Sequence, residues 1–197
     1  MFRKILFYFF FLIIFTNKSY SQINYKIITT VNNQPITQID LDREIEIIRI
    51  LNKTKNISKL ELSIPLTNLI DEKIKFQEIE KEKKTLDKKE INYLFNILIK
   101  NLNLNINDLD NEIIDIIKNK IKIDRLWNNL MIEKFSRKIN INMQEIENKI
   151  QNIKVNDQEE KEKIKEKLII EEKNKKLVIL SKNYFNKIKQ ESLIKNF

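Results

Sequence analysis

The chain of 197 residues contains no cysteine, no histidine and no glycine, and it also lacks alanine. Without histidine and cysteine it cannot form a Ser-His-Asp triad, a Cys-His dyad, a zinc finger or a disulfide. Without glycine it cannot form a P-loop, a dinucleotide-binding fingerprint or a nucleophile elbow, since each needs a backbone that bends where only glycine fits. Aspartate and glutamate remain, so composition leaves open a carboxylate-dependent hydrolase or an acidic metal site.

The residues that are present indicate a basic, globular chain. There are 37 Lys and Arg against 28 Asp and Glu, a formal net charge of +9. Hydrophobic residues make up 42% and charged residues 33%, which is typical of a folded domain. The two signs of charge are interleaved, and no basic cluster carries aromatic residues. We therefore expect solvated helix faces and no nucleic-acid partner.

The N-terminus has the pattern of a secretory signal peptide. A short basic start precedes an apolar run of 11 residues, Ile5–Phe15, and Ser19 and Ser21 are small residues at the spacing that signal peptidase requires. We predict a signal peptide over residues 1–21, cleaved after Ser21, which leaves a net charge of +6. The alternative is an uncleaved membrane anchor, although a span needs roughly 20 apolar residues.

Short strands are expected at both ends of the remaining chain. Lys26–Val31 is short and rich in β-branched residues, and a turn sequence at 32–35 leads into a return strand. The tail at 192–197 alternates weakly and is a third candidate strand. Thr37 and Asp40 have the spacing of a capping box, which predicts that a helix starts directly after the return strand.

Helices are expected over most of what lies between. Apolar residues recur every three or four positions, the period of an amphipathic helix. Leu41, Ile45, Ile48 and Leu51 should form the buried face of the first helix. No glycine or proline interrupts Asp108–Lys138, so we expect one long helix there. The predicted helices cover 38–53, 64–84, a stretch beginning after Asp87, 108–138, 144–152 and 158–190.

One acidic cluster needs its own interpretation. Asp108, Asp110 and Glu112 are spaced like the ligands of a cation loop, but an EF-hand requires a glycine and a terminal glutamate at fixed positions. Acidic residues are also favoured at the first turn of a helix, where they interact with free backbone N–H groups. We therefore interpret the cluster as a helix start and predict no metal and no cofactor.

Four short sequence segments, in the order in which they occur along the chain, resemble segments of SurA-type periplasmic chaperones of the trigger-factor and SurA peptide-binding superfamily. The first is the strand, turn and capped helix start at 27–37; the second is Leu-Ile-Asp-Glu-Lys-Ile at 69–74. The third is Arg125-Leu126-Trp127 with Phe135, and the fourth is the final helix over 164–194. The resemblance covers residues 24–152 and 157–197. It implies a SurA N-terminal-like helical domain at 22–155, completed by a C-terminal helix and strand at 156–197.

The resemblance implies a mainly α fold with a small β-hairpin or three-stranded sheet and a long C-terminal helix that packs back on the domain. Two features depart from the family. The parvulin domains that carry prolyl isomerase activity are missing between residues 152 and 157, and their histidines are absent. The family's glycine-containing turn is also missing near residues 108–123, which is why we expect one fused helix there.

The function implied by the resemblance is a periplasmic holdase, not an enzyme, that binds unfolded outer-membrane proteins or extended peptides without isomerase activity. Such a protein needs exposed apolar surface in a groove with a soluble rim. Ordinary core packing is the alternative role for each candidate, and it is the more common one. The candidates for peptide binding are the large aromatic and sulfur-containing side chains Phe76, Phe95, Trp127, Met131, Phe135, Tyr184 and Phe185.

Two other functions stay open from the residues alone. Long helices also suit an envelope structural or assembly protein that pairs with a fixed partner, although Lys173–Lys176 breaks the apolar seam of the last helix. A carboxylate-dependent enzyme is the third possibility, but no pair of acidic residues stands out from the helix surfaces. The oligomeric state does not follow from the sequence.

Overall fold

The structure is a computed structural model, and it describes residues 26–53, 63–153 and 157–197. The predicted signal peptide, with Ser19 and Ser21, lies outside the described residues, as does the proposed boundary between residues 155 and 156. The predicted mainly helical fold with a small sheet and a long C-terminal helix is confirmed. The elements are β1 (Ile27–Val31), β2 (Gln34–Thr37), α2 (Gln38–Asn52), α3 (Ser63–Lys81), α4 (Lys88–Asn101), η2 (Ile106–Asp108), α5 (Asn111–Phe135), η3 (Ser136–Lys138), α6 (Met143–Gln151), α7 (Gln158–Glu191) and β3 (Ile194–Asn196).

Polar side chains begin the helices by accepting hydrogen bonds from free backbone N–H groups. The capping box of α2 is present, because Thr37 accepts from the Asp40 N–H and Asp40 accepts from the Thr37 N–H. A single N-cap side chain begins each of four other helices. These residues are Asp87, Asp110, Asn142 and Asp157.

The sheet joins the two ends of the described chain. β1 lies in the middle, antiparallel to both β2 and β3, and β3 begins 163 residues after β1 ends. Val31 pairs with Gln34 across a two-residue turn on one side and with Ile194 on the other. The C-terminal strand therefore completes the sheet that the N-terminal hairpin begins, as the alternating tail predicts.

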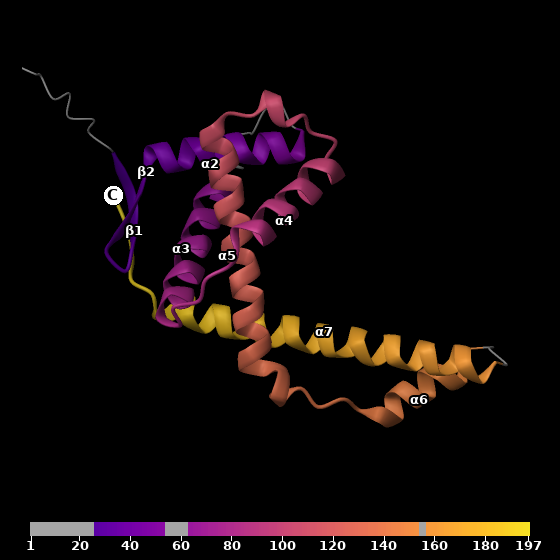
Figure 1. The fold of residues 1–197 in the computed structure, drawn as a ribbon. Helices are drawn as coiled ribbons and strands as arrows, with labels where there is room; N and C mark the ends of the chain where they lie inside the picture. Colours follow the sequence, from indigo (N-terminus) through magenta and orange to yellow (C-terminus); the bar gives the residue numbers. More distant parts are fainter. Residues whose placement is uncertain (1–25, 54–62, 154–156) are drawn as a thin grey trace, which may run out of the picture.

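The helices α2, α3, α4 and α5 form a body with the sheet at one end (Figure 1). α3 and α5 are its central elements, since α3 contacts α2, α5, α7 and β1, and α5 contacts α2, α3, α4 and α7. Three groups of buried side chains make the core: one between α3, α5 and α7, one between α2, α4 and α5, and one under the sheet. Burial of these apolar side chains supplies most of the stability of the helices, because Ile and Asn are mediocre helix formers.

α5 is one continuous helix of 25 residues, as expected from the absence of glycine and proline. It starts later than Asp108, however. Asp108 ends the short η2 segment and accepts a hydrogen bond from the Asn105 amide, and Leu109 is extended. The helix begins at Asn111 because Asp110 caps it by accepting from the Glu112 N–H.

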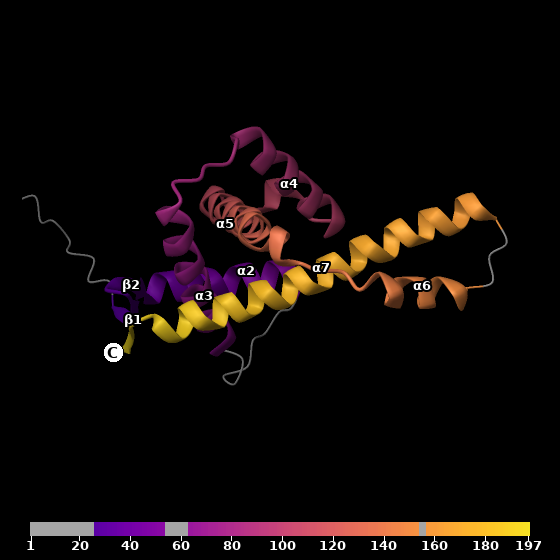
Figure 2. The ribbon, with the colours of Figure 1, turned by 90° about the horizontal axis from the view of Figure 1, so that it is seen from below.

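α7 has 34 residues and belongs to two parts of the molecule. Its C-terminal half packs on α3 and α5, whereas its N-terminal half extends beyond the body and contacts α6. Figures 1 and 2 show α6 and this half of α7 projecting together as an arm. We call α6 and residues 158–176 of α7 the arm.

Candidate functional site

Six of the seven predicted peptide-binding residues come together in one place, between α3, α5 and α7. Trp127, Met131 and Phe135 of α5 are buried there, and the remaining three are half-buried against them. The seventh, Phe95, lies in the separate core group between α2, α4 and α5, where it is also buried. The three half-buried members are Phe76, Tyr184 and Phe185.

The aromatic rings of this group fasten α7 to α5. The Trp127 and Tyr184 rings stack with centroids 6.2 Å apart, and Trp127 meets Phe185 edge-on at 5.9 Å. The indole N–H of Trp127 donates to the Ser181 hydroxyl at 3.3 Å, and Phe135 meets Tyr184 edge-on. These contacts add directional attraction to area burial. In this conformation the aromatic residues hold the C-terminal helix in place and do not form an open groove.

A network of polar side chains lies at the edge of this contact between α3, α5 and α7. The Tyr184 hydroxyl donates to the buried carboxylate of Glu78 on α3, and Lys81 lies 2.6 Å from the other oxygen of that carboxylate. Burial raises the pKa of Glu78, but hydrogen bonds from Lys81 and Tyr184 and the charges of Lys81 and Lys134 outweigh it, so its pKa stays below the ordinary value. Burial and the Glu78 charge raise the pKa of Tyr184 to about 12.

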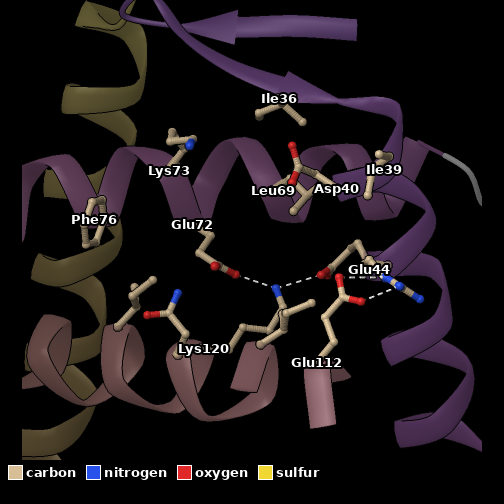
Figure 3. Close-up of a pocket in the computed structure, with 14 residues that line it drawn as sticks. Ile36, Ile39, Asp40, Glu44, Leu69, Glu72, Lys73, Phe76, Glu112 and Lys120 are labelled. Atoms are coloured by element: carbon tan, nitrogen blue, oxygen red, sulfur yellow. Dashed lines mark hydrogen bonds and ion pairs between the residues drawn. The ribbon is translucent and has the colours of Figure 1, made fainter. Parts of the chain in front are cut away.

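A hollow of about 340 Å³ lies where α2, α3 and α5 meet under β2 (Figure 3). Its volume is at the lower end of the range for small-ligand sites. Its walls combine aliphatic and aromatic side chains with charged groups. The apolar lining comes from Ile36, Ile39, Leu69, Phe76, Ile116 and Ile123.

A charged triad stands at the centre of this hollow. The Lys120 ammonium of α5 lies 2.7 Å from Glu44 Oε2 of α2 and forms a second ion pair with Glu72 of α3. Figure 3 shows the two carboxylates approaching Lys120 from opposite sides. Glu44 is only 3% exposed; its Oε1 accepts from the Asn68 amide, while its Oε2 has no partner besides the Lys120 ammonium. The triad therefore places two carboxylates and one ammonium at the centre of the hollow.

The electrostatics of Lys120 agree with this arrangement. Burial lowers the pKa of Lys120, but the charge of Glu72, hydrogen bonds to both carboxylates and the charge of Glu44 outweigh it and raise the pKa above its ordinary value. Lys120 therefore carries its charge at neutral pH. A second hollow of about 470 Å³ shares Glu44, Glu72 and Lys120, so the triad separates two cavities.

The sequence did not point to this triad. Leu41, Ile45, Ile48 and Leu51 were expected to form the buried face of α2, but each is only half-buried, and the fully buried positions are Glu44 and Ile47. The face is rotated because Lys120 neutralises Glu44 and lets a carboxylate occupy a core position. No local sequence pattern predicts the pairing of Glu44 with Lys120, since Lys120 lies 76 residues further along the chain.

The acidic cluster at 108–112 acts as predicted for a helix start. Asp110 is the N-cap of α5, and Glu112 pairs with Arg43 of α2 at 2.5 Å. In the part of the chain that the structure describes, no three acidic side chains come together in a way that would hold a metal ion. No helix within those residues is long and apolar enough to cross a membrane.

On the α7 part of the arm, Ile170 is an exposed apolar side chain on the side of the helix that is buried further along. Leu177 and Tyr184 are half-buried against the body, and Ile170 lies seven residues before Leu177, on the same face of the helix. Ile170 is nevertheless 57% exposed. The polar stretch Lys173–Lys176 separates it from the buried apolar residues, so Ile170 is a single exposed apolar residue beyond the end of the body.

α6 leaves this face of α7 uncovered because it packs on the opposite one. Leu168 is half-buried in the arm, and it lies nine residues before Leu177, which is half a turn away around the helix. Figure 1 shows α6 on one side of α7 and α2, α3 and α4 on the other, while α5 crosses α7. On α4, Tyr93 and Ile97 are a further exposed apolar pair at helical spacing.

The comparisons with known proteins give no family for this chain. No protein-family pattern matches the sequence, and no curated protein matches it.

Proposed function

We propose that the chain is a periplasmic holdase-type chaperone that binds unfolded outer-membrane proteins or extended peptide segments, without prolyl isomerase activity. The observation that carries this proposal is the arm, which projects from the body and exposes Ile170 on the side of α7 that is buried further along the helix. The predicted signal peptide supports export, and the resemblance to SurA-type proteins supports the class of client.

The geometry suits weak binding of extended chains. A client side chain that covers an exposed apolar residue gains about 25 cal/mol for each Å² removed from water. Several such contacts, at Ile170 and Val178 on α7 and at Tyr93 and Ile97 on α4, would add up to reversible binding without a deep pocket. Figure 1 shows α4 and the arm extending to the same side of α5, so one extended segment can reach both.

A holdase needs no chemistry on the client. The chain has no histidine or cysteine, and acidic residues such as Asp110, Glu112 and Glu72 serve as a helix cap or in ion pairs. The aromatic side chains that meet between α3, α5 and α7, among them Phe76 and Phe185, have an indirect role in this function. They hold α7 on the body, so that the arm keeps its position.

Aggregation of an unfolded outer-membrane β-barrel protein tests the proposal. The chain from residue 22, which contains every described element, is mixed at stoichiometric ratios with the urea-denatured client during dilution. We expect reduced light scattering and crosslinks from α4 and α7 to the client. Absence of protection by the unmodified chain would contradict the proposal.

A matched pair of variants tests the arm itself. Ile170→Lys places a charge at this exposed apolar position of α7, whereas Ile179→Lys makes the same change nine residues on, on the opposite face, at nearly equal exposure (57% and 58%). We expect Ile170→Lys to weaken protection and Ile179→Lys to preserve it, with circular dichroism confirming that both fold. Equal effects would argue against binding at this face. A stable complex with one folded partner, without protection of clients, would favour the alternative of an assembly protein.

A further inference from the structure

The hollow between α2, α3 and α5 contains an unbalanced carboxylate. Of the other carboxylates that line it, Glu112 is paired with Arg43 at 2.5 Å, and Asp40 caps α2 through Thr37. Lys120 alone serves both Glu44 and Glu72. The triad by itself therefore carries one negative charge in excess, although the chain as a whole carries a net charge of +9.

Other cations near the hollow do not compensate this charge. Arg43 is engaged by Glu112 at 2.5 Å and by Glu46 at 3.1 Å. Lys73 has no ion pair among the described residues, but Figure 3 shows its side chain on the side of α3 that faces β2, away from the triad. The excess charge therefore stays within the hollow.

Burying a net charge is costly, and a second cation in the hollow would relieve that cost. The carboxylates of Glu44 and Glu72 are placed to accept one, because both residues line both cavities and share the single ammonium of Lys120. The one polar contact of Glu44 Oε2 is the ion pair with Lys120 at 2.7 Å. A carboxylate oxygen can accept more than one hydrogen bond, so capacity remains.

The apolar walls of the hollow indicate which chemical groups the rest of the ligand should carry. Aliphatic side chains from β2, α3 and α5, such as Ile36, Leu69 and Ile116, surround the approach to the triad, and the ring of Phe76 lies on the same wall. A chain of methylene groups would fit these surfaces, with its charged end at the carboxylates. At about 340 Å³ the hollow is far larger than the roughly 30 Å³ of one water molecule.

We propose that this hollow binds an aliphatic ammonium group, supplied either by a lysine side chain of a polypeptide or by a free diamine. The methylene chain lies against Ile36, Leu69 and Phe76, and the ammonium lies against Glu44 and Glu72 beside Lys120. The inference does not rest on the proposed chaperone function, because it concerns a different face of the body and a different chemistry of binding.

Calorimetric titration of the chain from residue 22 tests the inference with three probes. They are 1,5-diaminopentane, the blocked amide of lysine, and the blocked amide of norleucine, which keeps the methylene chain but has no ammonium. We expect at least one ammonium probe to bind about tenfold or more tightly than the norleucine amide. Binding of the lysine amide identifies a peptide source, and binding of the diamine alone identifies a small molecule.

Two variants locate the site. Glu72→Gln removes one charge from the triad at a position that is 23% exposed and therefore tolerant of change, and it should weaken ammonium binding about tenfold. Glu90→Gln, on α4, removes the same charge from an ion pair with Arg125 of α5, outside the hollow, and should leave binding unchanged. The inference is overturned if neither ammonium probe binds, if norleucine amide binds equally well, or if the two variants have the same effect.

Discussion

The Tyr184 hydroxyl of α7 donates a hydrogen bond to the buried Glu78 carboxylate of α3, across 106 residues of sequence. Lys134 of α5 donates to the same hydroxyl at 2.8 Å, and its ammonium lies 4.1 Å from the centre of the Tyr184 ring. Three helices therefore meet at one phenol. The long C-terminal helix is fastened by this polar contact as well as by the aromatic stacking beside it.

Tyr184→Phe should destabilise the fold by about 1–2 kcal/mol, because Glu78 loses a donor and is only 8% exposed. Urea unfolding followed by circular dichroism measures the change. Tyr93→Phe is the matched control, since Tyr93 lies on the surface of α4 at 65% exposure. We expect that variant to stay within about 0.5 kcal/mol of the unmodified chain. Equal losses from the two variants would mean that the hydroxyl of Tyr184 contributes nothing specific.

The same contact should make stability depend on pH at both extremes. The pKa of Tyr184 is raised to about 12 in the folded state from 10.0, so its contribution is complete below pH 10 and is lost as the pH rises through 12. The pKa of Glu78 is lowered from 4.5, so its contribution is complete above pH 4.5 and is lost as the pH falls through the lower folded value.

The alkaline change can be measured separately from lysine titration. Ultraviolet absorbance of tyrosinate should show a late step near pH 12 that Tyr184→Phe removes and Tyr93→Phe retains. The difference in unfolding free energy between the unmodified chain and Tyr184→Phe should also shrink between pH 10 and pH 12. A late step that survives in Tyr184→Phe would contradict the assignment.

Lys120→Met should be among the most damaging single substitutions, with a loss of about 3–5 kcal/mol, because it leaves Glu44 buried without a cation. Addition of Glu44→Gln to this variant removes the isolated charge and should recover a large part of the loss. Unfolding free energies of the two single variants and the double variant complete a thermodynamic cycle. Simple additivity in that cycle would show that the two side chains do not interact.

Local signals were readable from the sequence, whereas long-range pairing was not. The cap at Thr37, the start of the last helix at residue 158 and the unbroken helix through α5 follow from a few neighbouring residues each, and the structure confirms them. The buried position of Glu44 depends on Lys120. The amphipathic pattern of α2 therefore predicted the wrong residues for the middle of its buried face, which is formed by Glu44 and Ile47. The convergence of the aromatic residues on α7 likewise depends on how helices pack.

The lysines of the last helix show the same limit. Glu159 and Lys163, four residues apart, form an ion pair at 2.6 Å. Lys176, which was suited by spacing to pair with a glutamate one turn earlier, donates instead to the backbone carbonyl of Asn140 at 2.6 Å. The carbonyl belongs to the connection that leads into α6, so the arm, and not the helix itself, decides where this lysine points.

The absence of glycine has a structural consequence at the tip of the β1–β2 hairpin. Its two-residue turn requires positive φ at both positions, which are occupied by Asn32 at 49° and Asn33 at 68°. Asparagine tolerates this left-handed conformation better than most residues, but glycine adopts it without a steric cost. The two asparagines nevertheless differ. Asn32 donates to Gln77 at 2.7 Å and accepts from the Leu193 N–H at 2.8 Å, which joins the turn to α3 and to the start of β3.

Glycine at these two positions should therefore have opposite effects. Asn33→Gly relieves the left-handed conformation and should stabilise the fold by about 0.5–1 kcal/mol. Asn32→Gly gives the same relief but removes two hydrogen bonds, each worth about 1 kcal/mol, and should destabilise it by a similar amount. Thermal and urea unfolding of both variants measure these two changes in the free energy of unfolding. Stabilisation by both would mean that the Asn32 side chain does not hold the ends of the sheet together.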